Sequence, residues 1–251
     1  MKVSVADVLV AGGGAIGLSV AEAAARRGLS VTLLERERVG ARASWAGAGM
    51  LNCRPWPRTT RGGPDYFDLL LASIRLHEQW AARLLEETDI DVGFRRCGAV
   101  ELYTPERNDA KGVGQIGRLL EGCAARGVRC QRINAADVKA LEPRVAVQDI
   151  VAALHLPDDA QIRPPRFARA LALSCRQREV VVNEGAAVAD VWIEDGQARG
   201  VVMSDGTRHG AGSVVMCTGA WTGQFETLRR LAPRIGRIEP VRGQSRCVRA
   251  W

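Results

Sequence analysis

Three glycines near the start of the chain have a spacing that suits phosphate binding. Gly12, Gly14 and Gly17 follow the apolar run from Val8 to Ala11, which is short and β-branched enough for a buried strand. Gly12 suits a tight turn, Gly14 a close approach of the backbone to a pyrophosphate, and Gly17 close packing of helix on strand. These residues together predict a binding site for a dinucleotide.

An acidic residue stands where the ribose of a dinucleotide would lie. We expect a helix from Ala15 to about Arg27, with its N-terminal N–H groups directed at the phosphate, and a second strand from Ser30 to Leu34. Glu35 follows that strand, eighteen residues after Gly17, and its carboxylate can accept hydrogen bonds from a ribose 2′-OH. The acid disfavours NADP, although an arginine such as the adjacent Arg36 can accept its 2′-phosphate. FAD and NAD both stay open from this stretch alone.

The composition describes a globular protein with enough apolar residues for a core. The 251 residues allow one large domain or two modest ones, and 47% of them are apolar. The net charge of +7 comes from arginines spread along the chain, whereas a nucleic-acid-binding protein would concentrate its basic residues in a patch or tail. We therefore expect no nucleic-acid partner.

The cysteines and histidines point to neither a disulfide framework nor a metal site. There are seven cysteines, an odd number with no C-x-x-C pair, and three scattered histidines. The sequence reaches its first strand at once, with no room for a signal peptide, and no stretch approaches eighteen uninterrupted apolar residues. We expect a cytoplasmic protein without a membrane segment and without a bound metal.

The middle of the chain is expected to alternate between helices and short strands. A loop rich in glycine and alanine follows Glu35 as far as Pro57, in which Ser44 offers a hydroxyl group to a phosphate or ribityl chain or has no ligand at all. The further expected elements are a helix over 65–88, a strand pair over 92–103, a helix over 108–126, a strand over 128–133, a short helix capped by Asn134, an apolar run over 150–156 and a helix over 165–178.

A β-meander is expected in the last third of the chain. Short apolar segments at 180–182, 187–192, 199–204 and 207–210 are separated by turns such as Asp195-Gly196, and they lead into an apolar strand at 213–217. The strand ends in Thr218-Gly219. A meander before a returning strand differs from the regular βαβ repeats of NAD dehydrogenases, and it favours the flavin-binding variant of the Rossmann fold.

Seven motifs, taken in their order, give the chain a family resemblance. They are GGGAIG at 12–17, ER at 35–36, ASWAGAGML at 43–51, LEP at 141–143, LPDDAQIRPP at 156–165, CTGAWTG at 217–223 and PVRGQ at 240–244. On these motifs the chain resembles the D-amino-acid oxidase superfamily of FAD-dependent oxidoreductases, and within it most closely the ThiO-type glycine oxidases of thiamine biosynthesis. The resemblance implies an α/β fold, with a Rossmann-type FAD-binding domain that carries a β-meander and an incomplete α+β substrate domain.

The resemblance also implies how each motif meets the cofactor FAD. The backbone of Ala15 and Ile16 would contact the pyrophosphate, and Glu35 and Arg36 would hold the adenosine ribose. The remaining implied contacts are Ala43, Ser44, Ala48, Gly49 and Met50 along the pyrophosphate, ribityl chain and isoalloxazine, the Val188 backbone at the adenine, and Thr218 and Gly219 at a second close approach. FAD-binding segments are expected at 1–90 and 158–230, and parts of the substrate domain at 91–157 and 231–251.

Members of this family oxidise an amino acid by passing a hydride to flavin N5, and O₂ reoxidises the flavin to give H₂O₂. The expected partners are therefore a small, glycine-like amino acid and O₂, with a homo-oligomer left open. No catalytic triad or carboxylate pair is needed, because the flavin supplies the chemistry. No catalytic side chain is assigned, and neither His155 nor His209 is predicted to be a catalytic base.

The end of the sequence departs from the family pattern. Seven residues, SRCVRAW, follow PVRGQ, and they show neither the expected strand nor an arginine assignable to carboxylate binding. We expect a truncated or frame-shifted chain that retains FAD weakly and is poorly soluble. Three functions stay open: a glycine-type oxidase, a related sarcosine-type oxidase or D-amino-acid dehydrogenase, and an inactive Rossmann fragment.

Overall fold

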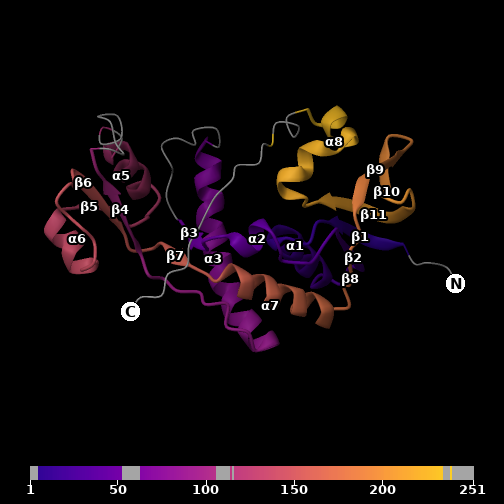
Figure 1. The fold of residues 1–251 in the computed structure, drawn as a ribbon, viewed down its shortest axis with the longest axis horizontal. Helices are drawn as coiled ribbons and strands as arrows, with labels where there is room; N and C mark the ends of the chain where they lie inside the picture. Colours follow the sequence, from indigo (N-terminus) through magenta and orange to yellow (C-terminus); the bar gives the residue numbers. More distant parts are fainter. Residues whose placement is uncertain (1–4, 53–62, 106–113, 115, 234–237, 239–251) are drawn as a thin grey trace. The chain divides into compact units, whose positions relative to one another are not determined.

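The computed structural model describes residues 5–52, 63–105, 114, 116–233 and 238. The chain forms two compact units, each assembled from separate segments of sequence. Unit 1 contains Met1–Ala48, Arg83–Val92 and Arg163–Trp251, and unit 2 contains Gly49–Ala82 and Gly93–Ile162. Figure 1 traces the chain through both.

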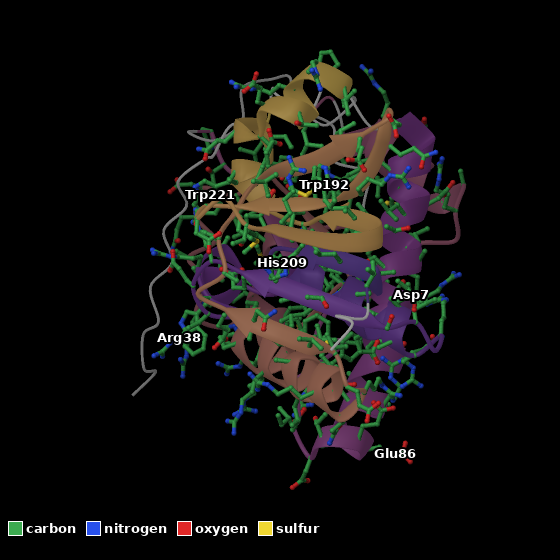
Figure 2. The ribbon with its side chains drawn as sticks, turned by 90° about the vertical axis from the view of Figure 1, so that its right-hand side faces the viewer. Asp7, Arg38, Glu86, Trp192, His209 and Trp221 are labelled. Atoms are coloured by element: carbon green, nitrogen blue, oxygen red, sulfur yellow. The ribbon has the colours of Figure 1, made fainter. Side chains whose placement is uncertain are left out.

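Unit 1 is built on a six-stranded sheet. Its strands are β1 (Ala6–Ala11), β2 (Val31–Glu35), β8 (Val181–Glu184), β9 (Val188–Glu194), β10 (Gln197–Met203) and β11 (Arg208–Met216). The order across the sheet is β8-β2-β1-β11-β10-β9, with the first four strands parallel and β10 and β9 antiparallel. The parallel strands and the β-meander thus form one continuous sheet, which Figure 2 shows from the side.

The helices of unit 1 cover apolar side chains of the sheet and are joined to the strands by short turns. They are α1 (Ala15–Ala25), α2 (Ala43–Ala46), α7 (Pro164–Gln177), the 3₁₀ helix η1 (Gly219–Gln224) and α8 (Glu226–Leu231). Helices α1 and α7 pack together, with Leu18 and Leu171 fully buried and the Cys175 thiol 3.6 Å from the Leu18 carbonyl oxygen. Apolar burial on this scale is the main stabilising contribution to such a unit.

A cluster of ion pairs fastens α1 to α7 and to the end of α3 (Gly63–Thr88). Glu22 is fully buried and accepts a hydrogen bond from Arg83 at 2.8 Å. Glu87 accepts hydrogen bonds from Arg26 at 2.7 Å and from Arg178 at 2.9 Å. Burial raises the pKa of Glu87, but these two arginines outweigh it and hold the pKa below its usual value. The Glu87 carboxylate therefore stays charged in the folded protein.

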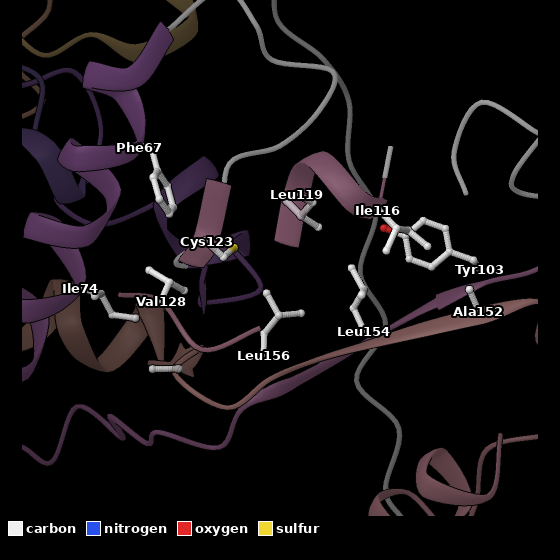
Figure 3. Packing of buried hydrophobic residues seen from close by; sticks show 11 residues of the cluster. Phe67, Ile74, Tyr103, Ile116, Leu119, Cys123, Val128, Ala152, Leu154 and Leu156 are labelled. Carbon is white, nitrogen blue, oxygen red and sulfur yellow. The ribbon is translucent and has the colours of Figure 1, made fainter. Parts of the chain in front are cut away.

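Unit 2 has a small antiparallel sheet packed against helices. Its elements are the first part of α3, then β3 (Met50–Leu51), β4 (Ala99–Tyr103), α5 (Ile116–Ala124), β5 (Gln131–Ile133), α6 (Ala135–Leu141), β6 (Ala152–Leu156) and β7 (Ala160–Gln161). The sheet order is β4-β6-β5, and β3 pairs with β7. Figure 3 shows the core, in which Leu119 and Cys123 of α5 lie against Leu154 and Leu156 of β6.

The architecture confirms the predicted α/β fold class, and most of the predicted elements are present. Asn134 caps α6 through a capping box with Asp137, as its position in the sequence indicated. The predicted strand pair over 92–103 is wrong, because only β4 forms. Gly93 and Gly98 have φ angles of +70° and +69°, which interrupt an extended strand, although Arg95 still bridges to Gln161.

Three further expectations need correction. The segments 207–210 and 213–217 are one strand, β11, because its first part pairs with β10 and its later part pairs with β1. The first predicted meander segment, 180–182, belongs instead to β8 beside β2. The amphipathic pattern of the expected helix over 65–88 puts Leu85 on its apolar face, but Leu85 is 46% exposed in α3. Motif PVRGQ and the tail after it lie outside the described residues.

Candidate functional site

The turn between β1 and α1 is built so closely that glycine is required at two positions. Gly12 has a φ angle of +105°, and a Cβ atom there would lie 2.4 Å from the carbonyl oxygen of Cys217. A Cβ atom on Gly17 would lie 1.8 Å from the carbonyl oxygen of Gly12. Both contacts involve backbone, which cannot rotate away as a side chain can. The steric tasks predicted for these two glycines are therefore confirmed.

The N-terminus of α1 carries a short polar lining. Gly14 is the N-cap residue and provides no side-chain cap. The Ser44 hydroxyl accepts a hydrogen bond from the Ala15 amide at 2.8 Å. In the described part of the chain, the Ile16 amide donates to no protein acceptor. An unpaired N–H at a helix N-terminus favours an anionic ligand, because the helix dipole adds to its positive potential.

The Glu35 carboxylate braces the glycine turn from the end of β2. One of its oxygens accepts a hydrogen bond from the Gly13 amide at 2.7 Å, and the other accepts one from the Glu37 amide at 2.9 Å. The backbone adds a third link, since the Gly12 amide donates to the Leu34 carbonyl at 2.8 Å. The carboxylate is thus held in a fixed orientation at the carboxyl end of the parallel strands, where open α/β sheets bind ligands.

Arginines surround the segment after Glu35. The Arg42 guanidinium donates to both carboxylate oxygens of Glu37, at 2.8 and 2.7 Å, and this pairing holds the pKa of Glu37 below its usual value. Arg42 itself has a φ angle of +58°, a left-handed backbone conformation that costs a non-glycine residue free energy. Strained residues of this kind gather at ligand sites, which agrees with the position of Arg42 in the wall of a cavity.

A cavity of about 640 Å³ joins these groups, within the usual range for small-molecule sites. Eleven of the residues predicted to contact the cofactor line it: Gly12, Gly14, Ala15, Ile16, Glu35, Arg36, Ala43, Ser44, Val188, Thr218 and Gly219. Gly17 lies beneath the turn rather than in the wall. Among the described residues, Ala48, Gly49 and Met50 are not part of the lining, and the last two belong to unit 2.

Sequence reasoning missed several residues of the cavity wall. They are Gly13, Arg38, Ala41, Arg42, Ala186, Ala187, Ala189, Cys217, Trp221, Gln224 and Phe225. Gly13 and the pair Cys217 and Trp221 fall inside motifs already quoted, so those motifs could have indicated them. Burial raises the pKa of the Cys217 thiol, which therefore stays protonated and is a weak nucleophile.

The structure offers no obvious metal site or membrane segment in the residues it describes. No three histidine, cysteine, aspartate or glutamate side chains in that part of the chain come together as metal ligands. No described helix is both long and apolar enough to cross a membrane. The chemistry available at the cavity comes from backbone N–H groups, arginines, one carboxylate and hydroxyl groups.

Comparison with known proteins identifies the family. The model of the family described as "FAD dependent oxidoreductase" (DAO) matches residues 7–251. The chain belongs to this family. It is 30% identical over 247 residues to the glycine oxidase of Geobacillus kaustophilus. This match covers 97% of the present chain and 62% of the relative. It is 28% identical over 245 residues to the bifunctional protein ThiO/ThiG of Trichormus variabilis, covering 94% of this chain and 34% of the relative.

A solved structure of glycine oxidase from Geobacillus kaustophilus has the same fold as this family member. Its TM-score is 0.76 at 28% sequence identity, over 92% of this chain and 58% of that one. The chain therefore spans about three fifths of the length of the glycine oxidase relatives that it matches. The resemblance inferred from the motifs is confirmed at the level of the family, and FAD is the cofactor of that family.

The cavity fits the diphosphate and adenosine parts of FAD. The glycine turn lines the cavity without a Cβ atom in the way, and so does Ile16, whose amide has no protein acceptor among the residues that the structure describes. Small residues, including Ala43, Ala187 and Ala189, form much of the wall, so a flat ligand can lie close to the backbone. The acid Glu35 at the end of β2 suits a ribose without a 2′-phosphate.

Proposed function

We propose that the chain is an FAD-dependent amino-acid oxidase of the glycine oxidase type, acting in thiamine biosynthesis in the cytoplasm. The observation that carries the proposal is the cavity of unit 1, which is lined by eleven of the residues predicted to contact the cofactor, most of them at or just after the carboxyl ends of β1, β2 and β11. The match of the family model to residues 7–251 and the relatives named glycine oxidase and ThiO/ThiG support the substrate class and pathway.

In this proposal the backbone of unit 1 binds the cofactor. The backbone of Ala15 and Ile16 contacts the pyrophosphate, together with the Ser44 hydroxyl that accepts from the Ala15 amide. Glu35 and Arg36 hold the adenosine ribose. The Val188 backbone contacts the adenine, and Thr218 with Gly219 makes a second approach. The segments 1–90 and 158–230 then act as the FAD-binding domain, and 91–157 with 231–251 act as parts of the substrate domain, with Ala48, Gly49 and Met50 beside the flavin.

The protein's part in the reaction is to bind, orient and exclude water. When bound, FAD supplies the hydride acceptor for the amino acid and the route by which electrons reach O₂, with H₂O₂ as product. No described side chain is assigned a proton-transfer role, since none of the cavity residues forms a pair of acid and base. Glu35 acts on the ribose and not on the substrate.

The test is an absorption titration of the purified chain with FAD, followed by anaerobic addition of glycine. The proposal predicts a shifted flavin spectrum, bleaching by glycine, and stoichiometric H₂O₂ when air is admitted. Bleaching by sarcosine or a D-amino acid without peroxide would favour a dehydrogenase that passes electrons to a carrier. A chain that binds FAD but is bleached by none of these amino acids would contradict the proposed activity.

A further inference from the structure

Trp221 carries an arginine on its indole ring at the wall of the cavity. The guanidinium carbon of Arg36 lies 3.9 Å from the ring centroid. Arg36 directly follows Glu35 at the end of β2, and Trp221 belongs to η1 after β11, so the stack joins two segments that both line the cavity. Indole is the aromatic ring that attracts a cation most strongly.

The backbone that carries Trp221 is held by hydrogen bonds within and next to η1. The Trp221 amide donates to the Thr218 carbonyl at 3.1 Å, which closes the first turn of η1. The Thr222 hydroxyl lies 2.8 Å from the Gly219 carbonyl oxygen and 2.9 Å from the Thr218 hydroxyl. These bonds set the backbone that carries the indole, which is about one third exposed at the cavity wall.

The stack leaves the N–H edge of Arg36 available. Its only ion pair in the described part of the chain is with Glu37, and the Nε to Oε1 distance of 3.7 Å exceeds a hydrogen bond. Both oxygens of Glu37 are already engaged by Arg42. No described acceptor takes a hydrogen bond from the Arg36 guanidinium. Stacking on the ring face therefore leaves up to five donors for a ligand in the cavity.

We infer that Trp221 is a positioning residue for the adenosine end of the cofactor, and that it acts through Arg36. The inference rests on the proposed FAD site. A free arginine side chain loses much rotamer freedom when it binds a ligand, and the indole reduces that loss because it holds the guanidinium over its ring beforehand. Trp221 thereby raises the affinity for ligands that contain adenosine diphosphate, whether or not they contain flavin.

The experiment measures equilibrium dissociation constants of FAD and of ADP for the parent chain and its variants. Replacing the indole in Trp221→Leu is expected to weaken both ligands by about fivefold to tenfold, from the strength of a cation–π contact. Trp221→Phe retains a ring and is expected to lose about twofold to threefold, because phenyl attracts a cation less strongly than indole. Thermal unfolding without ligand accompanies each measurement, so that a folding defect is recognised.

The chain provides a matched control in Trp192. Its ring also carries an arginine, with the Arg208 guanidinium carbon 4.8 Å from the centroid, but Trp192 is not among the described residues of the cavity wall. Figure 2 labels both tryptophans, with Trp192 over the β-meander. Trp192→Leu is expected to leave both dissociation constants unchanged.

A double-mutant cycle separates action through Arg36 from direct contact. Arg36→Gln is expected to weaken FAD and ADP at least as much as Trp221→Leu, and Trp221→Leu is expected to add nothing in the Arg36→Gln background. Additive losses would overturn the inference, since Trp221 would then contact the ligand by itself, and so would unchanged affinity in Trp221→Leu. If the parent chain binds neither FAD nor ADP, the FAD site and this role for Trp221 fail together.

Discussion

The replacement of Gly17 by alanine tests whether the closeness of α1 to the glycine turn matters for both stability and binding. The new Cβ atom would lie 1.8 Å from the Gly12 carbonyl oxygen and 3.0 Å from the Gly12 carbonyl carbon. Real Cβ atoms essentially never come closer than 3.0 Å to another heavy atom, so the helix and the turn must separate by roughly 1 Å. The obstacle is backbone, so neither side can yield by a simple change of rotamer.

The expected loss follows from two opposing contributions. Overpacking of this kind costs about 1–3 kcal/mol, and a rigid backbone obstacle belongs at the upper end. Alanine stabilises a helix interior by about 1 kcal/mol relative to glycine, which offsets part of this cost. We therefore expect Gly17→Ala to lower the free energy of unfolding by about 2 kcal/mol, which lowers Tm by about 4–8 °C in a chain of this size.

The same displacement moves the turn that faces the ligand, so FAD affinity should fall by more than about tenfold. Urea unfolding and FAD titration measure the two effects. Gly117→Ala is the control, because Gly117 also lies in a helix, α5, but has no atom near its missing Cβ. It should gain up to about 1 kcal/mol. A Gly17→Ala chain with the stability and FAD affinity of the parent would show that the close contact between α1 and the glycine turn matters for neither.

Other predictions concern parts of the structure away from the cavity. Glu22→Ala leaves the arginines around it without a buried carboxylate, so the free energy of unfolding should fall by about 3–5 kcal/mol in urea titrations; a loss below about 1 kcal/mol would show that the cluster is dispensable. Hydrogen bonds from Arg129 hold the pKa of Asp158 below its usual value, so this pair stabilises the fold above about pH 4 and the contribution disappears as the pH falls through the folded pKa. Asp158→Asn should therefore flatten the acid side of a stability–pH curve, by a modest amount because the pair is exposed, and an unchanged curve would contradict it. Asn134→Ala should cost about 1 kcal/mol through loss of the cap, whereas Asn134→Asp should retain most of the stability in thermal unfolding, and equal losses in both would argue against the capping box.

The first thirty-five residues show how much local sequence can determine. The glycine spacing, the helix after it and the acid at the end of β2 all follow from short-range rules, because each depends on neighbours in sequence. The exact hydrogen bonds of Glu35 were not predictable. Its two oxygens are held by the Gly13 and Glu37 amides, a result of how the turn folds back beside β2.

Contacts between distant segments were the part that sequence rules could not provide. The stack of Arg36 on Trp221 joins residues 185 positions apart, and no periodicity links them. The apolar pattern stops at Gly210 and Gly212, so it predicts two segments where the structure has the single strand β11. Pairing with β10 continues this strand through Gly210, which lies opposite Gly200. A Cβ atom on Gly200 would lie 1.9 Å from the His209 carbonyl oxygen, so the glycine at position 200 permits close pairing of β10 with β11.

Isothermal titration with FAD, FMN and NADPH shows whether the cavity of unit 1 binds FAD. We expect FAD to bind at one site per chain with a Kd on the order of micromolar, about −8 kcal/mol. FMN, which lacks the adenosine, and NADPH, whose 2′-phosphate would meet Glu35, should bind at least about tenfold more weakly. No FAD binding up to about 100 times that concentration, or equal binding of FAD and FMN, would show that the cavity is not an FAD site.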